Sequence, residues 1–298
     1  MLKSATRFLV SAAMLTAPLG GAFAHRQWML PSTTIVSGTD SWVTVDLAAS
    51  NDLFYADHQP GRVESIKVWQ PDGSEGAIQN AARGRYRSVF DVKLDKPGTW
   101  KIGNENSGIA GTFKVDGVEW RLGGRRGPPP APGAAGAPPS PANLPGGRTP
   151  PPSVETVAEI PANAADVKLT ETISRNEIFV TVGEPTTTVL KPTGRGLEFD
   201  PVTHPDELVA GEPAKFRFLV DGKPAAGVKL TVVMGGKRYR NAEGAVDYTT
   251  GADGVATINW PEAGMYWFNA TFSDAKSTTP RVTQRRLSYI ATVEVMTP

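Results

Sequence analysis

The sequence is dominated by short runs in which apolar and polar residues alternate, and helical periodicity is nearly absent. Two clear examples are the runs 43–47 and 216–220. Each run ends at Gly, Pro, Asp or Asn, as in the turn-like segment 221–224. Because a period of two turns one side of each run toward a core, this pattern predicts many short β-strands joined by turns. We therefore expect an all-β protein made of immunoglobulin-like antiparallel β-sandwiches.

A weak internal repeat indicates two such sandwiches. In each half a Gly precedes an aromatic run, first in the segment 97–102 and again in 263–268. Gly permits a tight entry turn, and a large ring then fills the space between two sheets. We predict an N-terminal β-sandwich domain at residues 25–192 and a C-terminal immunoglobulin-like β-sandwich domain at residues 193–298.

One segment of the N-terminal half has a composition unlike the rest. Residues 123–152 are dense in Pro, Gly and Ala and almost free of large apolar side chains. Such a segment buries too little apolar surface to fold, and its prolines favour extended conformations. We expect a disordered Pro/Gly-rich insert, with a proline-motif ligand for a partner as the alternative. The run 178–182 downstream is expected to return to the first sheet.

The first 24 residues have the pattern of an export signal. Lys3 and Arg7 precede a mostly apolar or small stretch, and Ala22-Phe23-Ala24 supplies the small-x-small cleavage pattern. No later segment is long enough to span a bilayer as a helix. We expect a signal peptide at residues 1–24, cleavage after Ala24, and a periplasmic protein that does not insert into the membrane. A buried N-terminal helix is the alternative interpretation.

Composition excludes several classes of function. The chain has no cysteine, so disulfides, thiolate metal sites and cysteine nucleophiles are absent. Removing residues 1–24 takes the formal charge from +1 to −1, because two cations and no acids are lost. That balance offers no footprint for nucleic acid. The sequence also has no Gly-x-Ser-x-Gly elbow, no phosphate loop and no conspicuous carboxylate pair. We expect a binding protein, not an enzyme.

Three histidines are the candidate metal ligands. After cleavage His25 would be the first residue, so that its α-amine and ring nitrogen can chelate one borderline metal ion. His58 lies in a loop-like stretch with two carboxylates, of which Asp57 is the nearer and Asp52 the further candidate. His204, near the predicted domain junction, is a third candidate. The spacing of 33 between His25 and His58 matches no short metal motif, and the alternative is plain polar surface.

The order of several motifs resembles one protein family. The start Ala24-His25-Arg26-Gln27-Trp28-Met29-Leu30-Pro31 and the segment His58-Gln59-Pro60 are similar to the domain-of-unknown-function 4198 family. Later segments resemble its second domain: 197–211, 221–227, 250–254 and 260–266. The likeness covers nearly the whole mature chain except the Pro-rich insert. This resemblance implies a periplasmic component associated with uptake of nickel, cobalt or related ions, with His25 and His58 at the family's histidine positions.

Three functional hypotheses follow. The first is an accessory protein that holds nickel, cobalt or copper on His25 and His58, with Asp57 completing the shell. It would present the ion to an inner- or outer-membrane transporter. The second is a recognition module that binds a protein partner or a glycan through exposed aromatic residues. The third is a histidine-brace copper oxidase, which would need a flat aromatic face for a polysaccharide.

Overall fold

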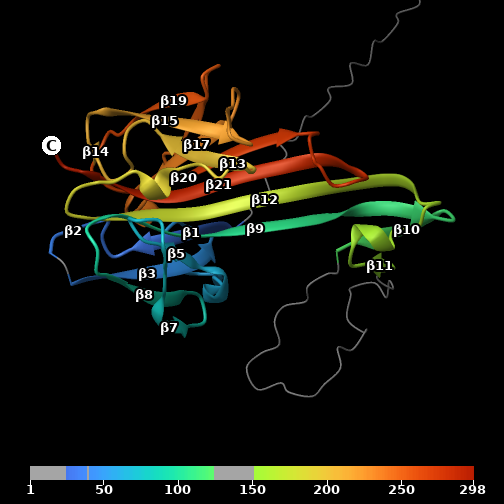
Figure 1. Cartoon of the computed structure of the whole chain (residues 1–298), viewed down its shortest axis with the longest axis horizontal. Coiled ribbons are helices and arrows are strands. Elements are labelled where there is room, and N and C mark those ends of the chain that lie inside the picture. The colour runs from blue at the N-terminus through green and yellow to red at the C-terminus, as the bar shows by residue number, and fades with distance from the viewer. Residues whose placement is uncertain (1–24, 39, 124–150) are drawn as a thin grey trace, which may run out of the picture.

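The protein is all-β, as the alternating runs predict. The computed structural model describes residues 25–38, 40–123 and 151–298. The predicted signal peptide 1–24 and most of the predicted insert 123–152 lie outside these residues. Within them the secondary structure consists of β-strands and four short 3-10 turns, with no α-helix (Figure 1). Nor does the described part contain a helix long and apolar enough to cross a membrane.

The first sheet comes from the N-terminal half and is antiparallel throughout. Its strand order is β1-β3-β8-β7, and β4 pairs with the end of β3 that β8 leaves free. The bounds are β1 (Arg26–Pro31), β3 (Ser41–Ser50), β4 (Gln59–Pro60), β7 (Gln79–Arg83) and β8 (Ser88–Leu94).

A twelve-stranded sheet runs through both halves of the chain. Its main path is β11-β10-β9-β12-β21-β20-β17-β18, with β2, β5, β6 and β14 attached at its sides. The bounds are β2 (Ile35–Val36), β5 (Lys67–Trp69), β6 (Glu75–Gly76), β9 (Gly98–Val115), β10 (Val118–Leu122), β11 (Ser153–Val154), β12 (Ala165–Val182), β14 (Leu208–Val209), β17 (Lys229–Met234), β18 (Val246–Thr249), β20 (Gly264–Asp274) and β21 (Val282–Met296). β12 and β21 join the two halves by a parallel pairing, which departs from the antiparallel pattern expected of such sandwiches.

A third, four-stranded sheet covers the C-terminal half of the large one. It has the order β13-β15-β16 with β19 beside β15, and all its pairs are antiparallel. The bounds are β13 (Leu197–Pro201), β15 (Pro213–Val220), β16 (Lys223–Pro224) and β19 (Val255–Asn259). The 3-10 turns are η1 (Val63–Ser65), η2 (Val157–Glu159), η3 (Thr188–Leu190) and η4 (Lys237–Tyr239).

Two main cores lie on opposite faces of the large sheet, which makes the molecule a pair of β-sandwiches. One core fills the space to the first sheet and includes Met29, Leu47 and Ile178. The other fills the space to the third sheet and includes Phe179 and Phe216. Because successive side chains of a strand point to opposite faces, neighbouring residues of β12 enter different cores. The predicted domain boundary at 192/193 falls between η3 and β13, and the division itself stays a prediction.

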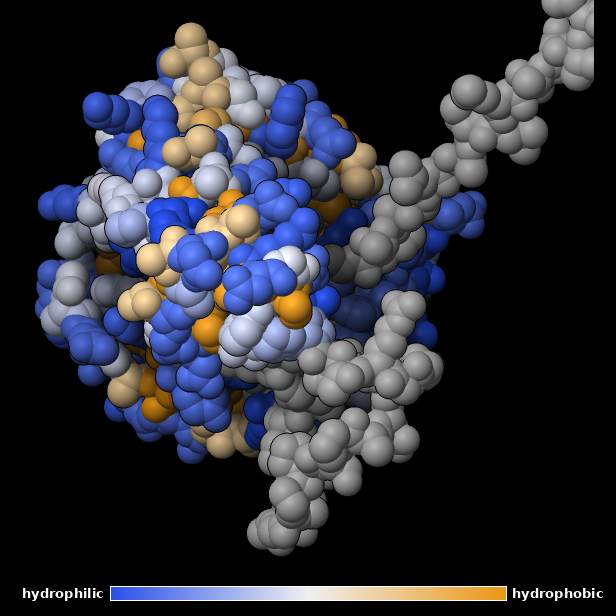
Figure 2. All heavy atoms as spheres, turned by 90° about the vertical axis from the view of Figure 1, so that its right-hand side faces the viewer, coloured by the Kyte–Doolittle hydropathy of each residue, from blue (hydrophilic) through white to orange (hydrophobic). Residues whose placement is uncertain are grey.

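The strands β9 and β12 extend beyond both sandwiches as a long arm (Figure 1). Their far ends, with β10 and β11, enclose a small apolar cluster that includes Phe113, Leu122 and Ile160. The outer face at this end of the molecule mixes polar and apolar side chains (Figure 2).

Candidate metal centre

The pairing of three strands brings two of the predicted histidines together. β1 and β4 flank the last residues of β3 on its two sides, so that Gln27 and Gln59 are both partners of Ala49. His25 stands immediately before β1, and His58 stands immediately before β4. The two histidines therefore arrive from opposite sides at the same end of β3, although 33 positions separate them in the sequence.

The imidazole rings of His25 and His58 are in face-to-face contact. Their centroids lie 3.4 Å apart, and the ring planes differ by 5°. Both residues are exposed. Rotation about the side-chain bonds of such a pair can turn one nitrogen of each ring toward a common ion. Imidazole suits zinc, copper and nickel, so this is a two-nitrogen site open to solvent.

The neighbouring carboxylates are engaged elsewhere. The two carboxylate oxygens of Asp57 accept hydrogen bonds from the backbone N–H and side-chain amide of Asn51, at 3.0 and 3.2 Å. Asp52 accepts a 2.7 Å bond from the Lys237 ammonium. In the described part of the chain, no group of three or more His, Asp or Glu residues is placed to hold a metal ion. Asp57 thus lies beside the histidine pair as a support of the loop.

A loop of the C-terminal half holds the histidine-bearing segments in place; we call residues 235–243 the clasp. The Arg26 guanidinium forms an ion pair with Glu243 and lies 5.3 Å from the ring centroid of Trp267. Its hydrogen bonds to Glu243 hold the pKa of that carboxyl below its usual value. Lys237 pairs with Asp52, which raises the pKa of the lysine.

The clasp also packs tightly against the His58 loop. A Cβ on Gly235 would come within 2.6 Å of the Phe54 ring, so the close approach requires glycine. Arg238 stacks over Tyr55 with its guanidinium carbon 3.8 Å from the ring centroid. Sequence reasoning missed the clasp because its partners are up to 217 positions apart.

The third predicted ligand, His204, lies in a different place and is buried, with 8% of its surface exposed. Its Nδ1 accepts the backbone N–H of Asp206, and its Nε2 lies 3.2 Å from both the Thr186 carbonyl and the Thr99 hydroxyl. Since a carbonyl only accepts, Nε2 carries the hydrogen in this arrangement. Burial lowers the pKa of His204, which agrees with a neutral ring.

The same buried cluster continues to a carboxyl group. The Thr99 and Thr181 hydroxyls lie 2.9 Å apart, and Thr181 donates a 2.6 Å bond to Asp206. Desolvation raises the pKa of Asp206 to about 7. Both ring nitrogens of His204 contact protein groups, and the structure places it in this buried cluster with Thr99, Thr181 and Asp206, whereas the other two histidines meet at the exposed end of β3.

The comparison with protein families identifies the chain. The model of the domain of unknown function DUF4198 matches residues 22–274, which include both exposed histidines and the strands from β1 to β20. The chain belongs to the DUF4198 family. No curated protein is similar enough in sequence to count as a relative.

Solved structures similar to this DUF4198 chain are distant. Trypsin-activated α-2-macroglobulin from Escherichia coli is 12% identical with a TM-score of 0.22, and the match covers 90% of this chain but 16% of that one. The D0–D1 domains of intimin are 11% identical with a TM-score of 0.20, covering 90% of this chain and 97% of the other. The tandem V-type regions of the chitin-binding protein VCBP3 are 10% identical with a TM-score of 0.18, covering 89% and 98%.

Proposed function

We propose that this DUF4198 protein is a periplasmic accessory protein that binds a divalent transition-metal ion and delivers it to a membrane transporter. The observation that carries the proposal is the contact between the His25 and His58 rings, at a centroid distance of 3.4 Å. Two of the chain's three histidines meet at one exposed point. Exposure suits a protein that must both capture an ion and release it.

The chemistry of the donors narrows the choice of ion. Cleavage of the signal peptide after Ala24 would add the α-amine of His25 to the two imidazoles, giving three nitrogen donors. Nitrogen donors bind nickel and copper more tightly than cobalt, following the general order of divalent affinities. We expect nickel, cobalt or copper as the cargo, and this order favours nickel and copper over cobalt. The clasp supports the site by holding Arg26 beside His25 and Asp52 on the His58 loop.

The proposal is tested by comparing two histidine substitutions in the processed protein. His58→Ala removes one imidazole ligand, and His204→Gln serves as the matched control because His204 is buried away from the pair. Calorimetric titration with nickel, cobalt and copper should show affinity lowered by about 100-fold in His58→Ala, of order the loss of one good ligand. The His204→Gln protein should bind as wild type does. Equal affinity of His58→Ala and wild type would overturn the proposal.

A second candidate function is recognition of a protein partner or a glycan. Tyr239 of the clasp has 92% of its surface exposed, and the neighbouring Tyr55 has 43% exposed. Exposed aromatic rings are frequent anchors in binding surfaces. This function predicts binding that survives a chelator and is lost in Tyr239→Ala, as measured on a glycan array or with a purified partner.

A further inference from the structure

The space between the first sheet and the large sheet changes from apolar to polar toward the histidine pair. On the first sheet Met29 and Leu47 are buried and face each other across β1 and β3. Two residues further along these strands, toward the histidine pair, Ala49 lies between Gln27 and Gln59. Because alternate residues share a face, the two glutamines continue the inner face of the core. His25 lies two residues before Gln27 and therefore at the end of the same face.

The opposite wall changes in the same way. On β9 and β12 the buried pair Ile102 and Ile178 is followed by the pair Asn104 and Asn176, and then by Asn106 with Ser174. Because alternate residues of a strand share a face, these side chains lie on the face of the large sheet that packs against the first sheet. Asn104 donates a hydrogen bond of 3.1 Å to Ser65, which fixes its amide. Amide and hydroxyl groups thus line both walls where an apolar core would otherwise continue.

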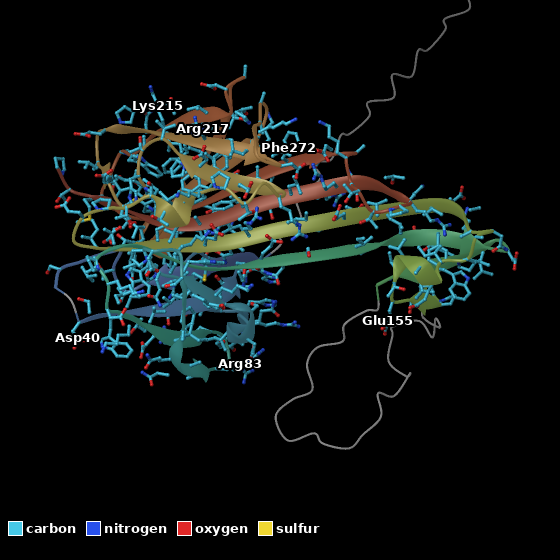
Figure 3. The ribbon with its side chains drawn as sticks, in the orientation of Figure 1. Asp40, Arg83, Glu155, Lys215, Arg217 and Phe272 are labelled. Atoms are coloured by element: carbon cyan, nitrogen blue, oxygen red, sulfur yellow. The ribbon has the colours of Figure 1, made fainter. Side chains whose placement is uncertain are left out.

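These walls enclose a groove with a cavity volume of about 390 Å³. Its polar lining includes Gln27, Gln59, Arg62, Arg83, Asn104 and Asn106. No Asp or Glu is among the described residues that line it. Arg83 comes from β7 at the lower margin of the first sheet in Figure 3.

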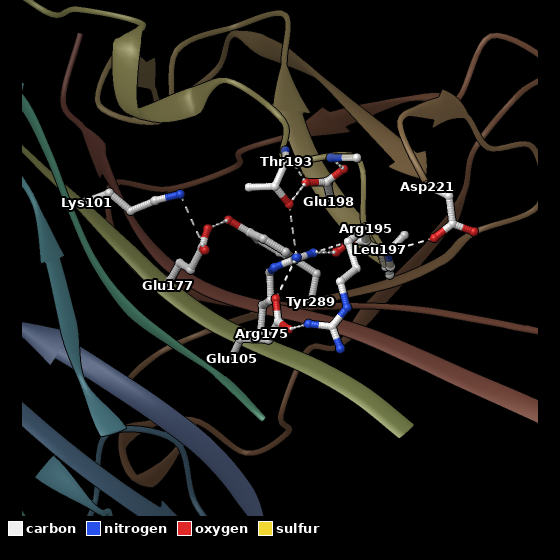
Figure 4. A network of polar contacts seen from close by, with 12 residues as sticks. Lys101, Glu105, Arg175, Glu177, Thr193, Arg195, Leu197, Glu198, Asp221 and Tyr289 are labelled. Carbon is white, nitrogen blue, oxygen red and sulfur yellow. Dashed lines mark hydrogen bonds and ion pairs between the residues drawn. The ribbon is translucent and has the colours of Figure 1, made fainter. Parts of the chain in front are cut away.

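The two arginines of the groove are free to bind an anion. Within the described residues neither Arg62 nor Arg83 forms an ion pair or donates a side-chain hydrogen bond. On the opposite face of β9 and β12, by contrast, the arginines are paired with a carboxylate. There the Arg175 guanidinium binds Glu105, which also pairs with Arg195 (Figure 4). A cationic groove without acids thus lies on one face of β9 and β12, and arginines paired with a carboxylate lie on the other.

The groove also offers neutral acceptors. Amide groups of Gln27, Gln59, Asn104 and Asn106 line it, and Asn104 is only 9% exposed. A buried amide of this kind is costly unless its hydrogen-bonding groups find partners. The two arginines suit a planar anion that each guanidinium binds through two N–H groups, and the amide oxygens of the lining suit a hydroxyl that donates to them.

We propose that the groove binds a small hydroxycarboxylate and that the protein's cargo is a metal ion chelated by such a molecule. The carboxylates would lie on Arg62 and Arg83, and the hydroxyl would lie among the amides. The volume suits a molecule of this size. Hydroxycarboxylates bind divalent metals through oxygen atoms, which leaves coordination positions for the nitrogens of His25 and His58. The metal part of this inference rests on the proposed function, whereas the groove part does not.

The groove is tested on metal-free protein with citrate as the probe. Calorimetry should detect citrate binding by wild type. The double variant Arg62→Gln/Arg83→Gln should weaken it by at least about 30-fold, of order the loss of one or two charge-assisted pairs. Arg85→Gln is the matched control, because Arg85 lies on the turn after β7 and outside the groove. Binding by the double variant equal to wild type, or no citrate binding by wild type, would overturn the inference.

Related probes test the chemistry of the ligand. Tricarballylate, which is citrate without its hydroxyl, should bind about 10-fold more weakly, as expected for one lost hydrogen bond to a buried group. Inorganic phosphate and the neutral polyol xylitol should bind more weakly still. Tricarballylate or phosphate binding as tightly as citrate would show that the hydroxycarboxylate assignment is wrong.

Titration with nickel separates the two proposals. If nickel binds but citrate does not, the hydroxycarboxylate inference fails and the metal-binding function stands. If citrate binds but nickel and nickel–citrate bind no more tightly in wild type than in His58→Ala, the metal-binding function fails and the groove stands. If both hold, nickel–citrate should bind more tightly than either component alone, and both sets of variants should weaken it.

Discussion

The three histidines lie in two contrasting environments: His25 and His58 are exposed, whereas His204 is buried. The first two are exposed and have their rings in contact at the end of β3. His204 is buried, and both its ring nitrogens contact protein groups. The same residue type is thus available for a ligand in one place and used up by the fold in the other. Solvent access and unoccupied nitrogens, more than sequence context, separate a candidate ligand from a structural histidine.

The largest effect is expected in the buried cluster, from Asp206→Asn. The pKa of Asp206 is raised to about 7 from its usual 3.8, so the folded protein binds this proton more tightly than the unfolded chain. Its stabilising contribution is therefore present below about pH 4 and is lost as pH rises to about 7, with a ceiling of about 4 kcal/mol. The substitution replaces the carboxyl group with a neutral amide, which does not titrate, and so removes this dependence.

Denaturant unfolding of both proteins between pH 4 and 8 measures this effect. The free energy of unfolding of Asp206→Asn relative to wild type should rise with pH through that window. His58→Ala, as control, should keep the wild-type profile. Parallel pH profiles for Asp206→Asn and wild type would show that Asp206 is ionised throughout.

A second effect of similar size is expected from His204→Ala. The substitution leaves the backbone N–H of Asp206 and the Thr186 carbonyl without their partners and opens space in a buried region. We expect a loss of about 3 kcal/mol in the free energy of unfolding. His58→Ala, at an exposed position, should cost under about 0.5 kcal/mol. Chemical denaturation that found the two variants equally stable would remove the distinction between the two environments.

The smallest effect is expected from loosening the clasp with Glu243→Gln. Arg26 and Glu243 are partly exposed, with side chains 22% and 25% accessible, so their ion pair should stabilise the protein by less than about 1 kcal/mol. Because Arg26 follows His25, metal affinity should fall by about 3-fold. Asp40→Asn is the matched control, since it breaks an exposed pair with Lys93 that lies elsewhere. Calorimetry that showed equal nickel affinity for both variants would mean that the clasp plays no part in the site.

Much of the fold followed from local patterns. Alternation in runs such as 43–47 and 216–220 predicted strands whose apolar residues enter the two cores, and the structure confirms the β-sandwich architecture. The parallel pairing of β12 with β21 was not predictable in this way. It joins residues more than 100 positions apart, and nothing in either strand's own sequence specifies its partner.

The candidate site was predictable only in part, because long-range strand pairing also decides which of its residues meet. The unusual position of His25 and the shortage of histidines selected the pair, but only the register of β1 and β4 on Ala49 brings the rings together. Asp57 as a ligand stays a prediction; its two carboxylate oxygens accept local hydrogen bonds from Asn51, a contact that the sequence alone did not indicate. Arg62 and Arg83 carried no sequence signal, because an unpaired arginine is recognised only when its surroundings in space are known.

The most direct test of the central claim is metal titration of the natively processed protein, which begins at His25, against a form that retains Ala24. The extra residue converts the α-amine of His25 into an amide and leaves every side chain in place. Nickel or copper should bind the native form at least about 100-fold more tightly than the form with Ala24. No nickel or copper binding by the native form would contradict metal binding at the exposed histidine pair, and equal affinity in the two forms would show that the α-amine is not a ligand.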